Sequence, residues 1–365
     1  MLGLETLYSV RRHLQKREQR SDAASLRQLF RELYESPRYQ EWLAGDQFFG
    51  ASDARSRFRV PAGFGKGHGE TKWLLERYGF VNGDVLTVKI DDHEGRIHLT
   101  DGNWVPAEYR VYPFSDESHD IVEHVKGSGL DREAQILVDP ACGCGHHALG
   151  LADIPVKVNF DVNPRALELA KINCILAGVD SMFCAENDIR GGMADHVDYL
   201  SVDRILITIN MPFAIFPALR KGPDAPKPAQ DGGRRGMELT EKAIEAIAGL
   251  CGNSRSRSVV GVVLAYSLGD PDKNRWDILE VAKRYLGDAK TNFKLLSHRK
   301  MWRVSGRKEQ PNPMPVQSLA LKAGCIHTYG DEQRAAANEG YQDLIAEYSD
   351  QGWTHLGYGL LTIER

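Results

Sequence analysis

Hydrophobic side chains recur at helical spacing in the first part of the chain. The period runs through residues 4–14 and starts again after a Ser-Asp pair that can cap a helix. Residues 4–45 are therefore predicted to be helical. A stretch rich in Gly, Ser, Arg and Phe at residues 46–68 predicts a loop, and residues 70–78 predict a short helix.

Short runs of β-branched and aliphatic residues follow these helices. Residues 85–90 and 96–100 flank a polar turn at residues 91–95, which predicts a β-hairpin. Residues 109–112 predict one more strand. Helices followed by a small group of strands indicate an α+β N-terminal domain over residues 1–118, of ordinary domain size.

The hydrophobic pattern changes near residue 120. From there, apolar runs typical of buried strands alternate with segments of helical spacing. This alternation predicts an α/β domain over residues 119–365, with a mixed, mostly parallel sheet and crossover helices. A last apolar run at residues 355–365 predicts a closing strand. The other predicted strands are residues 136–139, 156–161, 182–185, 204–209 and 259–266.

Composition narrows the class of protein. A chain of 365 residues is long enough for about two domains, and 42% hydrophobic with 26% charged residues is typical of a globular protein. A net charge of −4 argues against a generally basic, nucleic-acid-binding surface. Six cysteines without repeated pairs indicate a reducing compartment. Without a signal-like segment or an apolar stretch of membrane length, we expect a cytoplasmic protein.

The first strand of the α/β domain ends in a turn of small residues. Asp139 precedes Ala141, Gly143 and Gly145. Glycines at such a turn let the backbone approach a ligand, which would lie in the crevice beyond the strand ends. The dinucleotide fingerprint G-x-G-x-x-G is absent, and an acidic residue here suits a cationic amino group better than a pyrophosphate. A plain structural turn is the alternative.

Acidic residues also follow the second and third predicted strands. Asp161 ends the second strand, and its carboxylate can accept both hydroxyls of a ribose. Asn163 and Pro164 suit the start of the next helix, which leaves Asp161 for the ribose. Asp188 follows the third strand and can accept from an adenine amino group, although a solvated loop aspartate fits equally well.

The fourth predicted strand ends in Asn210-Met211-Pro212-Phe213. The Asn210 side chain and the Met211 carbonyl offer acceptors for the N–H groups of a planar nitrogen. Pro212 locks its own φ and favours an extended Met211, which fixes that carbonyl. Phe213 offers a face for stacking. The alternative is a turn that ends a strand over a buried phenylalanine.

These motifs carry a family resemblance. Residues 120–270 resemble class I, Rossmann-like S-adenosylmethionine-dependent methyltransferases, in the group with an (Asn/Asp)-Pro-Pro-(Tyr/Phe) motif. That group includes release-factor glutamine, adenine amino and small-domain rRNA methyltransferases. Residues 139–145 are similar to the first motif of the adenine enzymes, residues 161–173 resemble the second motif, and residues 231–240 resemble the Gly-rich segment after the fourth. Met211 stands where the group has its first proline.

The resemblance implies a cofactor and a reaction. S-adenosyl-L-methionine would donate a methyl group to nitrogen and leave S-adenosyl-L-homocysteine, without a metal. Asn210, Met211, Pro212 and Phe213 would be the catalytic residues. The residues implied to bind the donor are Asp139, Ala141, Gly143, Gly145, Asp161, Val162, Asp188, Ile189 and Asn210.

The identity of the methyl acceptor stays open. Asp116 and Glu117 precede the α/β domain and suit either a cationic substrate or a polar linker. Arg234 and Arg235 lie in a long loop, residues 217–236, with four Pro and four Gly, and suit a phosphate or carboxylate. A small molecule or metabolite is the first interpretation. An RNA base or protein glutamine is the second, and a non-catalytic donor-binding protein is the third.

Two other patterns have simpler explanations. Cys142, Cys144 and the histidines that follow Gly145 are spaced too tightly for a closed tetrahedral zinc site. The basic stretch at residues 11–20 is compatible with an RNA contact, but solvated helix faces often look the same.

Overall fold

The structure, a computed structural model, describes residues 11, 20–46, 58–61, 64, 71–93, 95–102, 105, 110–111, 116–179, 182–186, 202–211, 233, 235–253, 258–296, 312–319 and 331–365. The chain divides into two compact units. Unit 1 comprises Met1–Val122 and Asp139–Asp188, and unit 2 comprises Glu123–Val138 and Ile189–Arg365. The predicted domain boundary after residue 118 remains a prediction.

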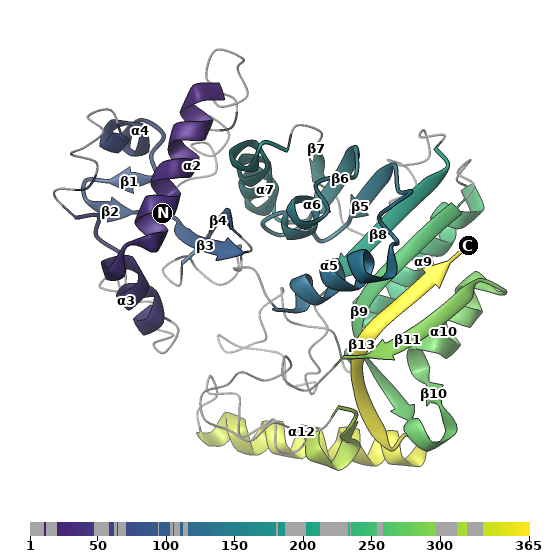
Figure 1. Ribbon diagram of the computed structural model, residues 1–365. Coiled ribbons are helices and arrows are strands. Elements are labelled where there is room, and N and C mark those ends of the chain that lie inside the picture. The colour runs from purple at the N-terminus through teal and green to yellow at the C-terminus, as the bar shows by residue number, and fades with distance from the viewer. Residues whose placement is uncertain are drawn as a thin grey trace. The chain divides into compact units, whose positions relative to one another are not determined.

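The N-terminal part of unit 1 consists of helices and a hairpin, as the sequence predicts (Figure 1). The helices are α2 (Arg20–Glu35), α3 (Pro37–Asp46) and α4 (Thr71–Arg77). Strand β3 (Lys89–His93) pairs antiparallel with β4 (Arg96–Thr100). Of the strand predicted at residues 109–112, residues 110 and 111 are described, and they belong to no strand.

The strand predicted at residues 85–90 is wrong in its extent. Its first residues form β2 (Val85–Leu86), which pairs with β1 (Val81–Asn82) in a separate small sheet. Thr87 still contacts the segment before β1, since its N–H donates to the Phe80 carbonyl and its hydroxyl to the Gly79 carbonyl, each at 2.9 Å. The hairpin strand begins two residues after Thr87.

The rest of the chain alternates strands and helices, which confirms the predicted α/β pattern. From residue 116 to residue 186 the elements are α5 (Asp116–Ser128), β5 (Ile136–Asp139), α6 (His146–Gly150), β6 (Val156–Asp161), α7 (Pro164–Ala177) and β7 (Met182–Glu186). The later elements are β8 (Arg204–Asn210), α9 (Glu238–Asn253), β9 (Ser258–Asp270), β10 (Arg275–Trp276), α10 (Asp277–Leu286), β11 (Lys290–Leu295), β12 (Met314–Pro315), α12 (Asp331–Asp350) and β13 (His355–Glu364).

The strands of the predicted α/β domain form a mixed, mostly parallel sheet, as the sequence predicts. Within unit 2 the strand order is β11-β13-β9-β8-β5, and within unit 1 β6 pairs with β7. The pairs β5–β8, β8–β9 and β6–β7 are parallel. The closing strand β13 is antiparallel to both β9 and β11. The short strands β10 and β12 pair antiparallel with the last residues of β9 and the first residues of β13.

Helices cover both faces of the sheet in unit 2. His124 on α5 lies 2.9 Å from the Thr362 hydroxyl on β13. The next residue along β13, Ile363, points to the opposite face, where it and Ile247 of α9 flank Gly261 of β9. Burial on both faces explains why the central strands are continuous apolar runs. This layered arrangement is the α/β fold that the alternation predicts and the Rossmann-like fold that the resemblance implies.

In unit 1, helix α7 shares one hydrophobic core with the N-terminal helices. Leu169 and Ile172 belong to the same buried cluster as Phe30 of α2. A buried ion pair joins α7 to the residue that follows β4, because Arg165 Nε and Nη2 donate to the Asp101 carboxylate at 2.7 and 2.5 Å. The packing fixes the first turn of α7, which directly follows the end of β6.

Candidate functional site

The turn between β5 and α6 contains two glycines with different structural roles. Gly145 has a φ of 86°, and a Cβ there would lie 3.1 Å from the Cβ of Ala170 on α7. Gly145 therefore allows both a left-handed conformation and close packing of the turn on the helix. Gly143 has a φ of 51°, but a Cβ there would meet nothing within 4 Å among the residues that the structure describes. The turn is packed at Gly145 and has open space at Gly143.

The buried carboxylate of Asp139 makes two contacts that stabilise this turn. Its side chain is 1% exposed, and one carboxylate oxygen accepts from the Ala141 N–H at 3.2 Å. The other oxygen lies 2.8 Å from Nδ1 of His147. His147 thus has a structural partner that the sequence did not reveal. Direct contact of Asp139 with a cationic ligand remains a prediction.

Asp161, at the end of β6, connects that strand to the same turn. One carboxylate oxygen accepts from the Gly143 N–H and the other from the Asn163 N–H, each at 2.9 Å. A carboxylate oxygen has a second lone pair, so each can accept one further hydrogen bond. Asn163 caps α7 by accepting from the Arg165 N–H, which confirms the predicted cap.

The surroundings of Asp161 disfavour its charge. Burial raises the pKa of this carboxyl to about 6, and the nearby Asp139 contributes to the rise. The two backbone N–H donors act in the opposite direction. A ligand that donates hydroxyl hydrogen bonds to the carboxylate would favour the charged form further, because hydrogen bonding to an ionised group lowers its pKa.

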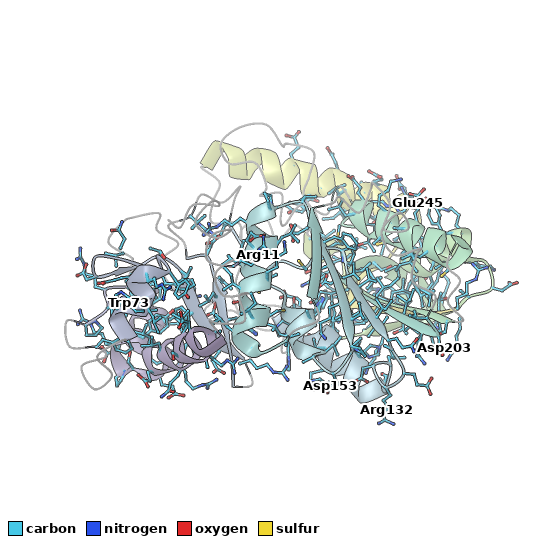
Figure 2. All side chains as sticks on the ribbon, turned by 90° about the horizontal axis from the view of Figure 1, so that it is seen from above. Arg11, Trp73, Arg132, Asp153, Asp203 and Glu245 are labelled. Carbon is cyan, nitrogen blue, oxygen red and sulfur yellow. The ribbon has the colours of Figure 1, made fainter. Side chains whose placement is uncertain are left out.

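Val162 follows Asp161 and exposes an apolar surface. Its exposed fraction is 62%, and the other large exposed hydrophobic side chain in the described ranges is Trp73, at 53% (Figure 2). Isolated exposed side chains of this kind are ordinary. Val162 directly follows Asp161, so its apolar surface lies beside the carboxylate that is predicted to bind a ribose.

Asn173 on α7 is a positioning residue that sequence reasoning missed. Its side-chain amide donates to the carbonyls of Leu99 and Cys144, at 3.0 and 2.9 Å. Its oxygen accepts from the Leu99 N–H at 2.8 Å. Asn173 therefore fastens the turn between Gly143 and Gly145 to strand β4. The sequence offered no signal for this role, because Leu99 lies 74 residues away.

We expect Asn173→Ala to weaken both the fold and the turn. The change leaves buried backbone groups without their partner, which costs about 1–3 kcal/mol per group. Thermal unfolding should shift to lower temperature, and ligand affinity at the turn should fall. Gln28→Ala, in an exposed side-chain pair on α2, is the matched control and should change neither. Unfolding of Asn173→Ala at the parental temperature would contradict the positioning role.

Asn210 lies at the end of β8, next to β5 in the sheet. Val138 of β5 pairs with Ile207 of β8, so both strands end at the same edge. The chain leaves β5 for β6 and β7 before it returns to β8, and such a reversal marks the ligand-binding crevice of open α/β sheets. Asn210 is half-buried and Met211 is 7% exposed. Pro212 and Phe213 lie outside the described residues.

The other predicted site residues have varied surroundings. Glu117 is half-buried in the first turn of α5, which begins at Asp116. Arg235 pairs with Asp277 at the start of α10, at 2.9 Å. Burial raises the pKa of Asp277, against the effect of Arg235. Asp188, Ile189 and Arg234 lie outside the described residues, and so does most of the loop at residues 217–236.

The basic N-terminal stretch is represented by Arg11 in the described ranges. Arg11 Nε lies 2.7 Å from the buried carboxylate of Glu168 on α7. Lys171 contacts the other oxygen of Glu168, at 3.0 Å. Arg11 therefore has an internal partner that its position in a basic run did not suggest.

The cysteines of the turn are buried thiols. Burial raises the pKa of Cys144 to about 12, so this thiol is protonated near neutral pH. Within the residues that the structure describes, no three His, Cys, Asp or Glu side chains are grouped so that they could hold a metal ion. None of the helices in those ranges is both long and apolar enough to cross a membrane.

Comparison with known proteins gives matches to solved structures alone. No protein-family model and no curated sequence matches this chain. M. jannaschii TYW2 in complex with AdoMet is 10% identical, with a TM-score of 0.37, over 76% of this chain and 85% of that one. Trm5b from Pyrococcus abyssi is 15% identical, with a TM-score of 0.35, over 76% of this chain and 56% of that one.

A further match covers almost the whole chain. PH0793 from Pyrococcus horikoshii is 13% identical, with a TM-score of 0.35, over 93% of this chain and 99% of that one. Because these identities and TM-scores are low, the function of this chain is argued from its own residues.

Proposed function

We propose that this protein is an S-adenosylmethionine-dependent methyltransferase that acts on a planar nitrogen. The turn after β5 is the observation that carries the proposal. Gly143 borders open space, while the Asp161 carboxylate holds the Gly143 N–H and keeps lone pairs for two more donors. A ribose supplies two hydroxyls to such a carboxylate. The exposed Val162 suits a flat base beside them.

The acceptor side of the proposal rests on Asn210. It is the last residue of β8, and its strand neighbours β5, which leads into the donor turn. The Asn210 side-chain oxygen and the Met211 carbonyl would accept hydrogen bonds from the acceptor nitrogen. This contact would point the nitrogen lone pair at the methyl carbon. Phe213 would stack on the planar group, as the resemblance implies.

The proposed chemistry is a direct displacement. When bound, S-adenosylmethionine supplies a methyl group on a positively charged sulfur. The nitrogen lone pair would form the new N–C bond while the S–C electron pair stayed on sulfur, and the proton lost from nitrogen would pass to water. The chain contributes mainly proximity and alignment, which are large terms in a two-reactant step. No covalent bond to the enzyme is needed.

The acceptor class that we favour is a small molecule or metabolite. The net charge of −4 supports this choice, and so does Arg11, which binds Glu168 internally. An RNA base or a protein glutamine is the second candidate. RNA binding through phosphates would weaken steeply with added salt, whereas binding of a neutral metabolite would not. A donor-binding protein without catalysis is the third.

A mass measurement tests the proposal and separates these candidates. Pools of small metabolites, total RNA and cell proteins are each incubated with the protein and methyl-labelled S-adenosylmethionine. We expect a gain of one methyl in the metabolite pool. Label in the RNA or protein pool would instead identify the second candidate, an RNA base or a protein glutamine, as the acceptor. Donor binding without label in any pool would favour the third.

A further inference from the structure

A cavity in unit 1 lies away from the turn after β5. Its volume is about 450 Å³, within the size range of small-molecule sites. It lies at the amino end of β6, beside Ile154 and Lys157, whereas Asp161 ends the same strand. Four residues of extended chain separate Lys157 from Asp161 by about 13 Å. The cavity is therefore distinct from the site at the strand ends.

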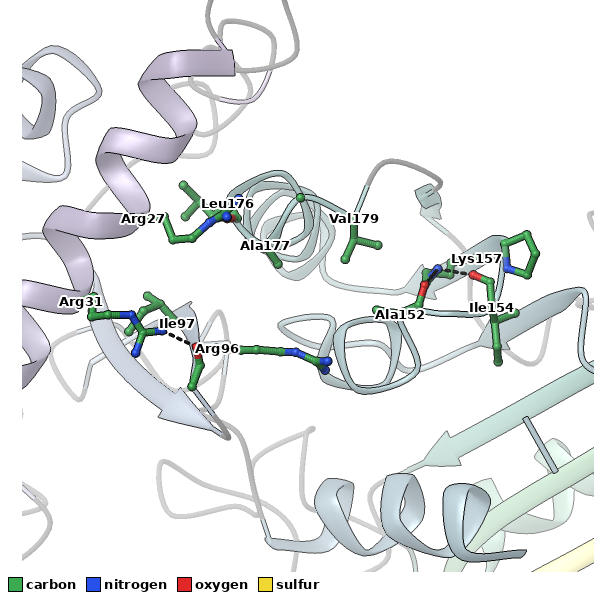
Figure 3. Close-up of a pocket in the computed structure, with 13 residues that line it drawn as sticks. Arg27, Arg31, Arg96, Ile97, Ala152, Ile154, Lys157, Leu176, Ala177 and Val179 are labelled. Atoms are coloured by element: carbon green, nitrogen blue, oxygen red, sulfur yellow. Dashed lines mark hydrogen bonds between the residues drawn. The ribbon is translucent and has the colours of Figure 1, made fainter. Parts of the chain in front are cut away.

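Four positively charged side chains line this cavity (Figure 3). Arg27 and Arg31 come from α2, Arg96 from β4 and Lys157 from β6. No carboxylate lies in the described lining. Asp92 and Glu35 contact Arg31 from outside the lining, at 3.2 and 3.7 Å. Positive charge in the cavity therefore exceeds negative charge.

Backbone carbonyls hold the arginines in place but do not neutralise them. Arg27 Nε donates to the Leu176 carbonyl at the end of α7, and Arg96 Nη1 donates to the Leu149 carbonyl of α6. A guanidinium has five N–H donors, so one such bond leaves several for a ligand. A charged group fixed in this way is preorganised, which lowers the entropic cost of binding.

Lys157 is the most buried of the four cations. Its relative exposure is 1%, and its ammonium donates to the Ala152 carbonyl at 2.9 Å and to the Ile154 carbonyl. An ammonium has three donors, so one remains after these two bonds. Burial lowers the pKa of Lys157, with smaller opposing effects from Cys174 and Asp153. An anion in the cavity would favour the charged form.

The remaining wall of the cavity is mostly apolar. It includes Ile97, Ile154, Pro155, Leu176 and Val179. Apolar side chains that lie among the cations suit a ligand with an organic part and an anionic group (Figure 3). The cations are half-buried or buried and come from three different elements, unlike an exposed basic stripe for nucleic acid.

We infer that this cavity binds the phosphate group of a phosphorylated small molecule. Arginine forks match phosphate geometry, and a phosphate has enough acceptor oxygens for several cationic donors, whereas a carboxylate has two oxygens. The apolar wall would hold the organic part of the ligand. This inference does not rest on the proposed methyltransferase function.

Calorimetric titration with inorganic pyrophosphate, in buffer without divalent cations, tests the inference. We expect binding to one site per chain. Arg27→Gln and Arg96→Gln should each weaken it roughly tenfold or more, because charge-assisted hydrogen bonds are lost. Arg59→Gln is the matched control, since Arg59 pairs with Asp84 on the exposed surface of the same unit, and it should leave binding unchanged. Circular dichroism checks that each variant is folded.

Further titrations distinguish a phosphate ligand from a carboxylate ligand, and this cavity from the proposed donor site. Citrate should bind more weakly than pyrophosphate, and Asp161→Ala should bind pyrophosphate as the parent does. Absence of pyrophosphate binding by the folded parent would overturn the inference. Binding unaffected by both arginine changes would also overturn it, because the anion would then lie elsewhere. If an RNA oligonucleotide binds and pyrophosphate does not, the ligand would be a nucleic acid and not a phosphorylated small molecule.

Discussion

Asn210→Ala is expected to lower the rate of methyl transfer about 10²–10³-fold, the usual effect of removing one aligned hydrogen-bonding group from a reacting centre. The contact to the acceptor nitrogen should be tighter in the transition state, when positive charge develops on nitrogen. Its loss therefore lowers the rate more than it weakens ground-state binding. S-adenosylmethionine should bind nearly as before. Single-turnover kinetics at saturating donor measures the step directly.

Asn210→Asp is the matched control for this experiment. Aspartate keeps the acceptor oxygen, and the related motif uses either residue, so this variant should retain much of the activity that alanine loses. Equal rates for the parent and Asn210→Ala on the true acceptor would remove the catalytic role of the residue. The protein would then be a donor-binding domain with its chemistry elsewhere.

Donor affinity is expected to depend on the charge of Asp161. Burial raises the pKa of its carboxyl to about 6. Above pH 7 the carboxylate is charged and accepts both ribose hydroxyls, so affinity should be constant. Below pH 6 the group binds a proton, and affinity should fall about tenfold per pH unit until the protonated form dominates binding. Calorimetry from pH 5 to pH 8, run on a buffer series, measures this curve.

The effect of Asp161 on the stability of the fold has a different pH dependence from its effect on donor affinity. The pKa of Asp161 rises from 3.8 to about 6 on folding, so the folded state takes up the proton more readily. The contribution of Asp161 to stability is therefore greatest at low pH and is lost as the pH rises through about 6. Loss of affinity below pH 6 would reflect the binding site.

Two variants distinguish the effect of the Asp161 charge from the effect of its hydrogen bonds to the ribose. Asp161→Ala removes two charge-assisted hydrogen bonds worth ~1.5–3 kcal/mol each, so affinity should fall about a hundredfold or more. Asp161→Asn keeps the shape without a titrating group, so its weaker binding should be flat with pH. A folded Asp161→Ala variant with parental affinity would refute the ribose assignment.

Local sequence patterns were sufficient to predict the strands that lie in the centre of the sheet. Strands β5 and β6 have the bounds that the sequence predicts, although the polar residues Lys157 and Asn159 alternate with the apolar residues of β6. Strand β9 extends to Asp270, beyond the predicted end at residue 266. Its polar and glycine-containing end pairs with β13, about ninety residues later, and this pairing has no local signal. Strand β11 has mostly exposed positions and was not predicted.

The same distinction holds for the candidate site. The helix cap at Asn163 follows from neighbouring residues, and so does the placement of Asp161 at a strand end. Asn173, by contrast, acts on Leu99, and Arg165 pairs with Asp101 across 64 residues. The cavity at Lys157 likewise combines α2, β4 and β6. Only the folded chain brings these groups together.

Calorimetric titration of the parental protein with S-adenosylmethionine, beside S-adenosylhomocysteine and a nicotinamide dinucleotide, tests the central claim most directly. We expect both sulfur compounds to bind one site per chain, with that site lost in Asp161→Ala. The dinucleotide should not bind, because the turn from Asp139 to Gly145 lacks the pyrophosphate-binding glycine pattern. Binding of the dinucleotide, with neither sulfur compound bound by the folded protein, would contradict the account.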